Sequence, residues 1–204
     1  VFNRRDFMRA IRILSWNERV FLVQRVIAGN DYRIVVLDNQ IISAYQRLPL
    51  SVVGDGHSSI EQLLHRKQAG FKKSDRDTQI PIDDTRIILR LKRLKKDLQS
   101  VLPKNECLEL LANANLSTGG DAVDVTQEIH PEWRKLAIKL AKDMNLRYCG
   151  VDVIVEGVLQ EPPKKFVVLE INAAPGLDNY ASMGLKQQKI VESMYKKVFQ
   201  AMIS

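Results

Sequence analysis

The chain has 204 residues, of which 45% are hydrophobic and 27% are charged, and its formal net charge is +7. This length can bury a real core in one large or two small domains, and the composition is that of a globular protein. No apolar run approaches the roughly 18 residues that a membrane-spanning helix needs, so we expect no membrane partner.

Apolar spacing and turn residues predict the elements in chain order. Helices are expected at 6–14, 60–68, 83–98, 131–144 and 185–202. Strands are expected at 21–27, 32–38, 41–48, 106–111, 149–155 and 166–171, with a hairpin turn at residues 38–40. Loops are expected at 52–59, 70–82 and 116–121. Because strands and helices do not alternate strictly, the order favours an α+β fold with a largely antiparallel sheet flanked by helices.

The positive charge gathers in residues 61–104, which hold 12 Lys and Arg against six Asp and Glu. Such a segment can bind phosphates or an acidic polymer, or it can be a solvated helix face. Aromatic residues do not interleave with these charges, which argues against nucleic acid as a partner. Only Cys107 and Cys149 occur, and their spacing fits no metal site, so we expect free thiols in a reducing cytoplasm.

Three oxygen-bearing side chains are expected to meet near the C-terminal end of the chain. Glu170 and Asn172 point to the same side of one predicted strand, because side chains alternate between the two faces of a sheet. Asp152 lies in the middle of another apolar, β-branched run. Two carboxylates and an amide oxygen suit a hard cation such as Mg²⁺. This trio predicts an enzyme that uses a nucleoside triphosphate.

Five motifs occur along the chain in a fixed order. They are the segments 29–33 (GNDYR), 53–56 (VGDG), 113–121 (NANLSTGGD), 150–153 (GVDV) and 170–176 (EINAAPG). Together they resemble one known family, the ATP-grasp superfamily of carboxylate–amine ligases. The similarity covers about residues 20–180 and is to the ligase domain shared by cyanophycin synthetase and bifunctional glutathione synthetases.

The resemblance implies a two-lobed protein that binds ATP with two Mg²⁺ ions, with Mn²⁺ as an alternative. It implies phosphorylation of a substrate carboxylate, followed by attack of an amino-acid or peptide amine on the acyl phosphate. By this resemblance Asp152, Glu170 and Asn172 are the metal ligands, and Glu170 bridges the two ions. Alternatively, Asp152 and Glu170 are charged surface residues or pair with a lysine.

The resemblance also implies the nucleotide contacts. The backbone of Arg25 and Ile27 would pair with the adenine edge, Gln24 would contact the adenine amino group, and Asp31 would accept from the ribose hydroxyls. Family members often have Glu at the position of Gln24, so this residue can equally be an ordinary strand residue. In the 113–121 loop, Asn115 and the amides of Gly119 and Gly120 would face phosphate, unless the two glycines form a plain turn.

Two arginines and one glycine complete the implied site. Arg33 would contact the γ-phosphate or acyl phosphate, and Arg47 the substrate carboxylate, since guanidinium binds both groups in a bidentate way. Each arginine can instead form a surface salt bridge. The amide of Gly176 would face the amine substrate, or Gly176 can be a simple turn residue.

The resemblance implies that the chain is incomplete as an enzyme. The chain begins at Val1 without an initiator Met, and we interpret it as a piece of a longer protein. Residues 1–20 are expected to end a preceding ATP-grasp lobe, which is missing. Residues 21–204 would form the C-terminal lobe, with the basic segment at about 58–104 resembling an insertion. The alternative functions are a non-catalytic, nucleotide-binding or regulatory ATP-grasp module and a binder of an acidic polymer. The oligomeric state stays open, and a homo-oligomer is compatible.

Overall fold

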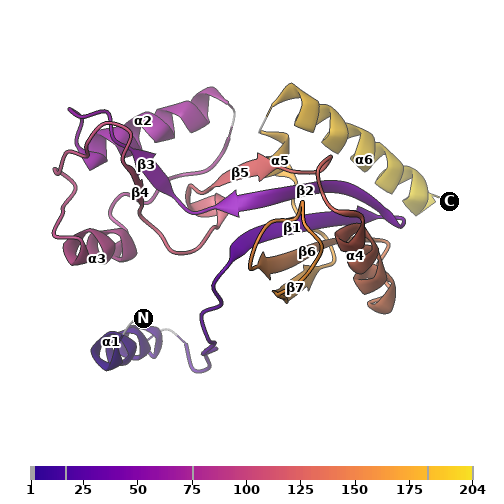
Figure 1. Cartoon of the computed structure of the whole chain (residues 1–204), viewed down its shortest axis with the longest axis horizontal. Helices are drawn as coiled ribbons and strands as arrows, with labels where there is room; N and C mark the ends of the chain where they lie inside the picture. Colours follow the sequence, from indigo (N-terminus) through magenta and orange to yellow (C-terminus); the bar gives the residue numbers. More distant parts are fainter. Residues whose placement is uncertain (1–2, 17, 75, 183, 204) are drawn as a thin grey trace.

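A five-stranded antiparallel sheet forms the centre of the molecule. The computed structural model describes residues 3–16, 18–74, 76–182 and 184–203. The strand order in the sheet is β5-β2-β1-β6-β7 (Figure 1). The bounds are β1 Asn30–Leu37, β2 Gln40–Leu48, β5 Asp121–Asp124, β6 Tyr148–Val155 and β7 Phe166–Asn172. The predicted α+β class with a largely antiparallel sheet is therefore confirmed. Strand β5 was not predicted.

The hairpin between β1 and β2 follows from its turn residues. Asp38 and Asn39 both have positive φ, at 45° and 65°, as a two-residue turn of the primed type requires. Asn and Asp tolerate this left-handed conformation better than other L-residues. A register shift between Val35 and Val36, whose partners are Ser43 and Ile41, leaves Ile42 as the extra residue of a bulge in β2. The predicted hairpin is confirmed.

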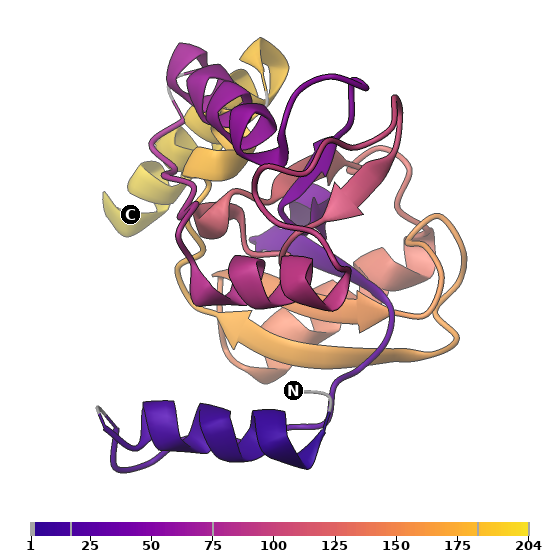
Figure 2. The same cartoon turned by 90° about the vertical axis from the view of Figure 1, so that its left-hand side faces the viewer.

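Helices cover the two faces of the sheet unequally (Figures 1 and 2). Helix α4 (Pro131–Asp143) packs on one face, over a continuous apolar cluster that includes Tyr32, Val151 and Val153. Helices α5 (Asp178–Ala181) and α6 (Leu185–Ile203) pack on the other face, but only over its apolar half. The remaining half of that face carries the charged residues described below.

A smaller unit with its own core lies at one end of the sheet (Figure 1). It contains α2 (Ile60–Lys73), α3 (Thr85–Arg93) and a two-stranded sheet of β3 (Ser51–Val53) and β4 (Cys107–Glu109). A capping box starts α2: Gln62 N–H donates to Ser59 Oγ, and Ser59 N–H donates to Gln62 Oε1. The Asp84 carboxylate caps α3 at Arg86 N–H.

Two predicted helix ends in this unit were wrong. Helix α2 continues five residues beyond Gln68, where Lys72 and Lys73 lie favourably in its last turn. Helix α3 ends at Arg93, before Leu98, because Lys95 adopts a left-handed conformation with φ 56° and Lys96 N–H turns back to the Leu91 carbonyl. The loop expected at 52–59 includes the end of β3.

The strand predicted at 21–27 is absent. This segment is extended but pairs with no other described residue in a sheet, and most of its side chains are exposed, including Leu22 at 78% and Val26 at 86%. A strand needs a partner edge, and both edges of β1, the strand that follows, are occupied by β2 and β6. The apolar pattern therefore indicated a segment that this chain alone does not bury.

Helix α1 (Arg4–Leu14) stands apart from the sheet and buries none of its residues (Figure 2). Its described contact with the rest of the chain is an ion pair between Asp6 and Arg93 of α3, at 2.8 Å. Trp16, which follows this helix, is 84% exposed. Residues 1, 2 and 17 of the predicted 1–20 segment lie outside the described residues.

Helix α4 buries one face against the sheet, formed by Trp133, Ala137 and Ala141. Leu136 and Leu140 are only partly buried, and Met144 is 55% exposed. Alanines let the helix approach the sheet closely, and the Trp133 indole N–H donates to the Glu161 carbonyl at 2.8 Å. Among the described residues, no helix combines the length and apolar character that a membrane crossing requires.

The two tryptophans test this arrangement. Trp133 has no exposed surface and Trp16 is almost fully exposed. We expect Trp133→Ala to lower the free energy of unfolding by about 3–5 kcal/mol through the cavity it leaves. The matched variant Trp16→Ala should stay within about 0.5 kcal/mol of the parent chain. Urea titration followed by circular dichroism measures both, and similar losses for the two variants would contradict the packing.

Candidate functional site

The charged half of one sheet face is built by strand alternation. Along β1, Asp31, Arg33, Val35 and Leu37 lie on the same face, because successive residues alternate between faces. Val35 and Leu37 are covered as part of the apolar cluster under α5 and α6. Asp31 and Arg33 lie at the other end of the strand, beyond these helices. The sequence of β1 thus divides this face into an apolar half and a charged half.

Asp152 is the centre of the charged half and is only 2% exposed. Its position in β6 is opposite Arg33 of β1 and opposite Glu170 of β7. Arg33 binds it in a bidentate way, from Nε to Oδ1 at 2.6 Å and from Nη2 to Oδ2 at 2.7 Å. Arg47 Nη1 of β2 donates to Oδ2 at 2.9 Å. Two guanidinium groups therefore compensate one buried carboxylate.

A second ion pair joins Arg47 to Asp31, its direct neighbour across β1 and β2. Arg47 Nε lies 2.8 Å and Nη2 lies 2.6 Å from Asp31 Oδ1. Burial raises the pKa of Asp31, although Arg47 opposes this shift. Burial also opposes the charge of Arg33, but the hydrogen bonds and charge of Asp152 outweigh it and raise the pKa of Arg33. The side chains of Arg33 and Arg47 are 17% and 13% exposed, so both arginines lie in partly buried ion pairs.

Glu170 and Asn172 complete a set of three oxygen-bearing side chains. They lie on the same side of β7, and Asn172 Nδ2 donates to Glu170 Oε1 at 2.9 Å. Glu170 Oε1 lies 3.9 Å from Arg33 Nη2, and the Glu170 side chain is 58% exposed. The predicted trio of Asp152, Glu170 and Asn172 therefore shares one edge of the site. The described residues contain no group of three His, Cys, Asp or Glu side chains suited to a metal, so a cation here would use two carboxylates and one amide.

A cleft of about 560 Å³ opens beside these charges. Four residues that we predicted to contact nucleotide or substrate line it, namely Ile27, Asp31, Arg47 and Asn115. Its other walls come from the turn before β1, the end of β2, β4 and the loop at 112–115, with Ile154 of β6. Gln24 and Arg25 lie earlier in the exposed 21–27 segment and do not line this cleft.

The 113–121 loop is more closely packed than a phosphate-binding loop needs to be. The amide of Gly119 donates to the Leu116 carbonyl and that of Gly120 to the Asn115 carbonyl, at 3.3 and 3.2 Å. Gly119 has φ 96°, and a Cβ on Gly120 would lie 2.5 Å from the Leu48 carbonyl oxygen. The two glycines are therefore explained by a turn, and contact of their amides with phosphate would require these hydrogen bonds to exchange.

Arg76 holds this loop, and no sequence pattern predicted this role. Its Nη2 donates to the carbonyls of Leu116 and Gly120, each at 2.6 Å, and its guanidinium lies over the Phe71 ring at 4.0 Å. Arg76 belongs to the basic segment, in which Arg66, Lys67, Arg86 and Arg93 also pair with carboxylates. Much of the charge that suggested a polymer-binding surface thus has a partner within the chain.

Gly176 lies in the turn that follows β7. A Cβ at this position would meet only Asp178 Oδ2, at 3.7 Å, so close packing does not require glycine here. The preceding residue, Pro175, is fixed from β6: Tyr148 Oη donates to the Pro175 carbonyl at 2.7 Å. Our prediction did not include Tyr148.

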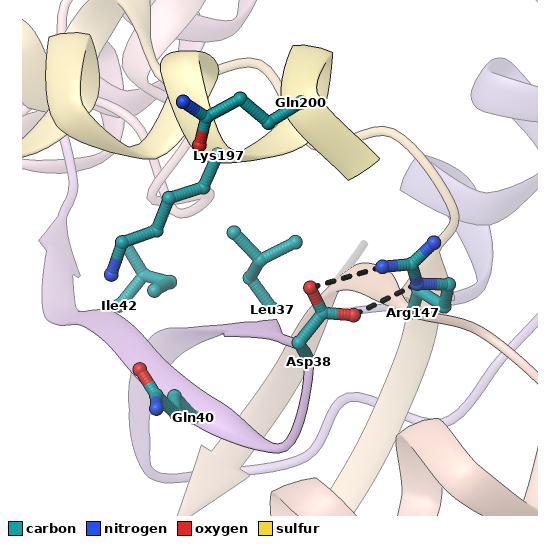
Figure 3. A pocket seen from close by; sticks show the side chains of 7 residues that line it. All are labelled: Leu37, Asp38, Gln40, Ile42, Arg147, Lys197 and Gln200. Carbon is teal, nitrogen blue, oxygen red and sulfur yellow. Dashed lines mark hydrogen bonds and ion pairs between the residues drawn. The ribbon is translucent and has the colours of Figure 1, made fainter. Parts of the chain in front are cut away.

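A second hollow, of about 490 Å³, lies at the other end of β1 and β2, near their turn (Figure 3). Leu37 and Ile42 are among its lining residues, and Asp38 and Arg147 form an ion pair at its rim, with Nε 2.8 Å from Oδ1. The charge and hydrogen bonds of Arg147 lower the pKa of Asp38. No predicted site residue lines this hollow.

Comparison with known proteins places these features in a family. The family described as "RimK-like ATP-grasp domain" matches residues 110–194. Cyanophycin synthetase from Synechocystis sp. is 37% identical over 164 residues, which cover 78% of this chain and 19% of that protein. The glutathione biosynthesis bifunctional protein GshAB from Pasteurella multocida is 29% identical over 210 residues, covering 98% of this chain and 27% of that protein.

A solved structure has the same architecture. The bifunctional glutathione synthetase from Pasteurella multocida matches with a TM-score of 0.67 and 28% identity, covering 97% of this chain and 28% of that one. The chain thus spans about a fifth to a quarter of the length of these relatives.

Removal of Arg33 tests the charge balance around Asp152. Arg33→Met should lower the free energy of unfolding by about 3 kcal/mol, because a buried carboxylate would lose its bidentate partner. The matched variant Arg86→Met breaks an exposed pair with Asp84 and should cost less than about 1 kcal/mol. Urea titration at neutral pH compares them. Equal costs would show that Asp152 does not depend on Arg33.

Proposed function

The chain contains a RimK-like ATP-grasp domain with the ATP-grasp fold, and we propose that it supplies one side of the active site of an ATP-dependent carboxylate–amine ligase. One observation carries this proposal. Four adjacent strand segments bring together two sets of side chains beside the cleft. The first set is Arg33 and Arg47, and the second is the oxygen-bearing trio of Asp152, Glu170 and Asn172. The relatives' names supply the reaction class.

The reaction needs both kinds of charged group, the arginines and the carboxylates that would hold a cation. A carboxylate is a poor electrophile, so transfer of the γ-phosphoryl group of ATP to it creates an acyl phosphate with a good leaving group. An amine then attacks the acyl carbon, forms the C–N bond, loses a proton and releases inorganic phosphate. The negative charge on the transferring phosphoryl group must be stabilised by cations and hydrogen-bond donors.

Asp152, Glu170 and Asn172 would hold the divalent cation in this scheme, with Asp152 exchanging at least one of its present arginine donors for the ion. Their donor set fits Mg²⁺, which takes one or two carboxylates and completes its shell with phosphate oxygens and water. When bound, the cation neutralises phosphate charge and orients the phosphates. Two ions, with Glu170 between them, remain part of the proposal, as does Mn²⁺ as a substitute. Glu170 is exposed and therefore accessible to such ions.

The guanidinium groups would act on the substrates. Arg33 would hold the transferring phosphoryl group, and Arg47 the carboxylate substrate, since both already bind carboxylate in a charge-assisted way. Asp31 would accept from the ribose, and the backbone of Arg25 and Ile27 and the side chain of Gln24 would face adenine.

The remaining contacts come from loops. Asn115, Gly119 and Gly120 would face the phosphates once the loop has adjusted. Gly176 would present its amide to the amine substrate, an amino acid or a peptide.

We propose that a preceding lobe covers the open side of this cleft. The exposed apolar side chains of residues 20–27 and the unburied helix α1 support a partner surface outside these 204 residues, as do relatives about four times as long as this chain. Residues 1–20 would then be the end of that lobe, and residues 21–204 the C-terminal lobe.

Calorimetry of the 204-residue chain tests this division. Because the phosphate contacts that the other lobe would supply are missing, we expect no micromolar affinity for MgATP. Micromolar binding would show that this chain holds a complete nucleotide site.

Loss of the oxygen ligands tests the activity in the full-length protein that carries this sequence. We expect Asp152→Asn and Glu170→Gln each to lower ATP-dependent phosphate release by about 100-fold or more, since cation and phosphate charge would lose their fixed partners. Glu170 is the cleaner position because its side chain is exposed and its loss should leave stability unchanged. Glu156→Gln, at another exposed acid, is the control. Unchanged phosphate release in the Glu170 variant would overturn the site.

A further inference from the structure

The turn that follows β7, Ala173–Gly176, lies against the charged half of the sheet and is held there by β6. Tyr148, Gly150 and Asp152 alternate along β6 and therefore lie on the same face. Tyr148 Oη donates to the carbonyl of Pro175 at 2.7 Å. Burial raises the pKa of Tyr148, so its hydroxyl stays protonated and able to donate at neutral pH.

Gly150 provides the space for this turn. A Cβ at position 150 would lie 2.8 Å from Pro175 Cβ and 3.5 Å from Arg33 Cδ. The first distance is shorter than real Cβ contacts allow, and the proline ring is rigid, so the turn would have to move. Asn172 is the direct partner of Gly150 across β6 and β7. The absent side chain thus lets the turn pass close to both the metal-ligand set and Arg33.

The far end of the turn is anchored by a separate set of contacts. Leu177 and Tyr180 have no exposed surface. The Tyr180 ring stacks on Tyr45 with a centroid distance of 5.4 Å, and its hydroxyl donates to Asp124 Oδ2 at 3.2 Å. The turn therefore spans two fixed points, the end of β7 and Leu177, and Pro175 is tied to the sheet between them.

We propose that Tyr148 and Gly150 are positioning residues that set how tightly the amine substrate is held, an inference that rests on the proposed ligase function. Tyr148 holds the Pro175 carbonyl near the sheet through its hydrogen bond, and the absence of a side chain at Gly150 leaves space for Pro175 there. Together they fix the next residue, Gly176, relative to Glu170 and Asn172. The amide of Gly176 then faces the amine at a constant distance from the carboxyl group under attack, which is the positioning that a bimolecular step needs.

Two variants perturb the turn by different physical means. Tyr148→Phe removes only the hydroxyl and keeps the ring, whereas Gly150→Ala keeps the hydroxyl and pushes Pro175 away. Each has a matched control in the chain. Tyr32→Phe removes a hydroxyl from a buried tyrosine on the opposite face of the sheet. Gly70→Ala adds a methyl group in α2, where nothing lies within 4 Å of it.

Steady-state kinetics of the full-length protein gives the first measurement. We expect Tyr148→Phe to raise the KM for the amine about fivefold, the loss of one net hydrogen bond, and Gly150→Ala to raise it further. In Tyr148→Phe, the KM for MgATP should change by less than about twofold, because the cleft beside Asp31 and Arg47 is untouched. Equal rises of both KM values, or an unchanged KM for the amine, would overturn the proposal.

Amide hydrogen exchange of the 204-residue chain gives a second measurement that needs no turnover. Both variants should accelerate exchange at residues 173–177 about fivefold or more, and the two controls should not. Unchanged exchange in Tyr148→Phe would overturn the tether. If the parent protein shows no amine-dependent release of ADP, the proposed ligase function fails, whereas the exchange result still decides whether Tyr148 holds the turn.

Discussion

The structure depends on one buried carboxylate, that of Asp152. A charge with 2% exposure is tolerated only when it is paired and hydrogen-bonded, and here Arg33 and Arg47 supply three donors to its two oxygens. This requirement determines what surrounds it: β1 and β2 must bring their arginines to the same face, and Asp31 must balance the second positive charge. The charged half of the sheet is a consequence of this balance.

The same balance explains why helices cover only part of this face. Helices α5 and α6 bury the apolar half, which includes Val35, Leu37 and Tyr45. An apolar helix over Arg33 or Asp31 would remove water from groups that still need it. The charged half therefore stays open beside the cleft, and the arrangement that satisfies Asp152 also leaves open the surface where we propose that a cation and phosphate bind.

Several residues act on the site from a distance. Arg76 closes the loop at 113–121, Tyr148 ties the turn after β7, and Gly150 makes room for it. These contacts connect the basic segment and β6 to loops that carry proposed substrate contacts. They also change how the basic segment is interpreted. Lys67 and Arg76 pair with Asp121, and Arg76 also donates to the loop carbonyls, so part of the charge of this segment supports the cleft.

The sequence by itself determined the fold class, the hairpin at Asp38–Asn39 and the trio of Asp152, Glu170 and Asn172, because side-chain alternation and turn preferences are local properties. It also determined the family, because the five motifs occur in the expected order along this one chain. Only the tertiary structure decided that segment 21–27 forms no strand, since pairing depends on a free sheet edge, and that α4 buries Trp133 and its alanines. It alone decided the partners of Arg33, Arg47, Arg76 and Tyr148, because these contacts join residues between 16 and 119 positions apart and no local pattern encodes them.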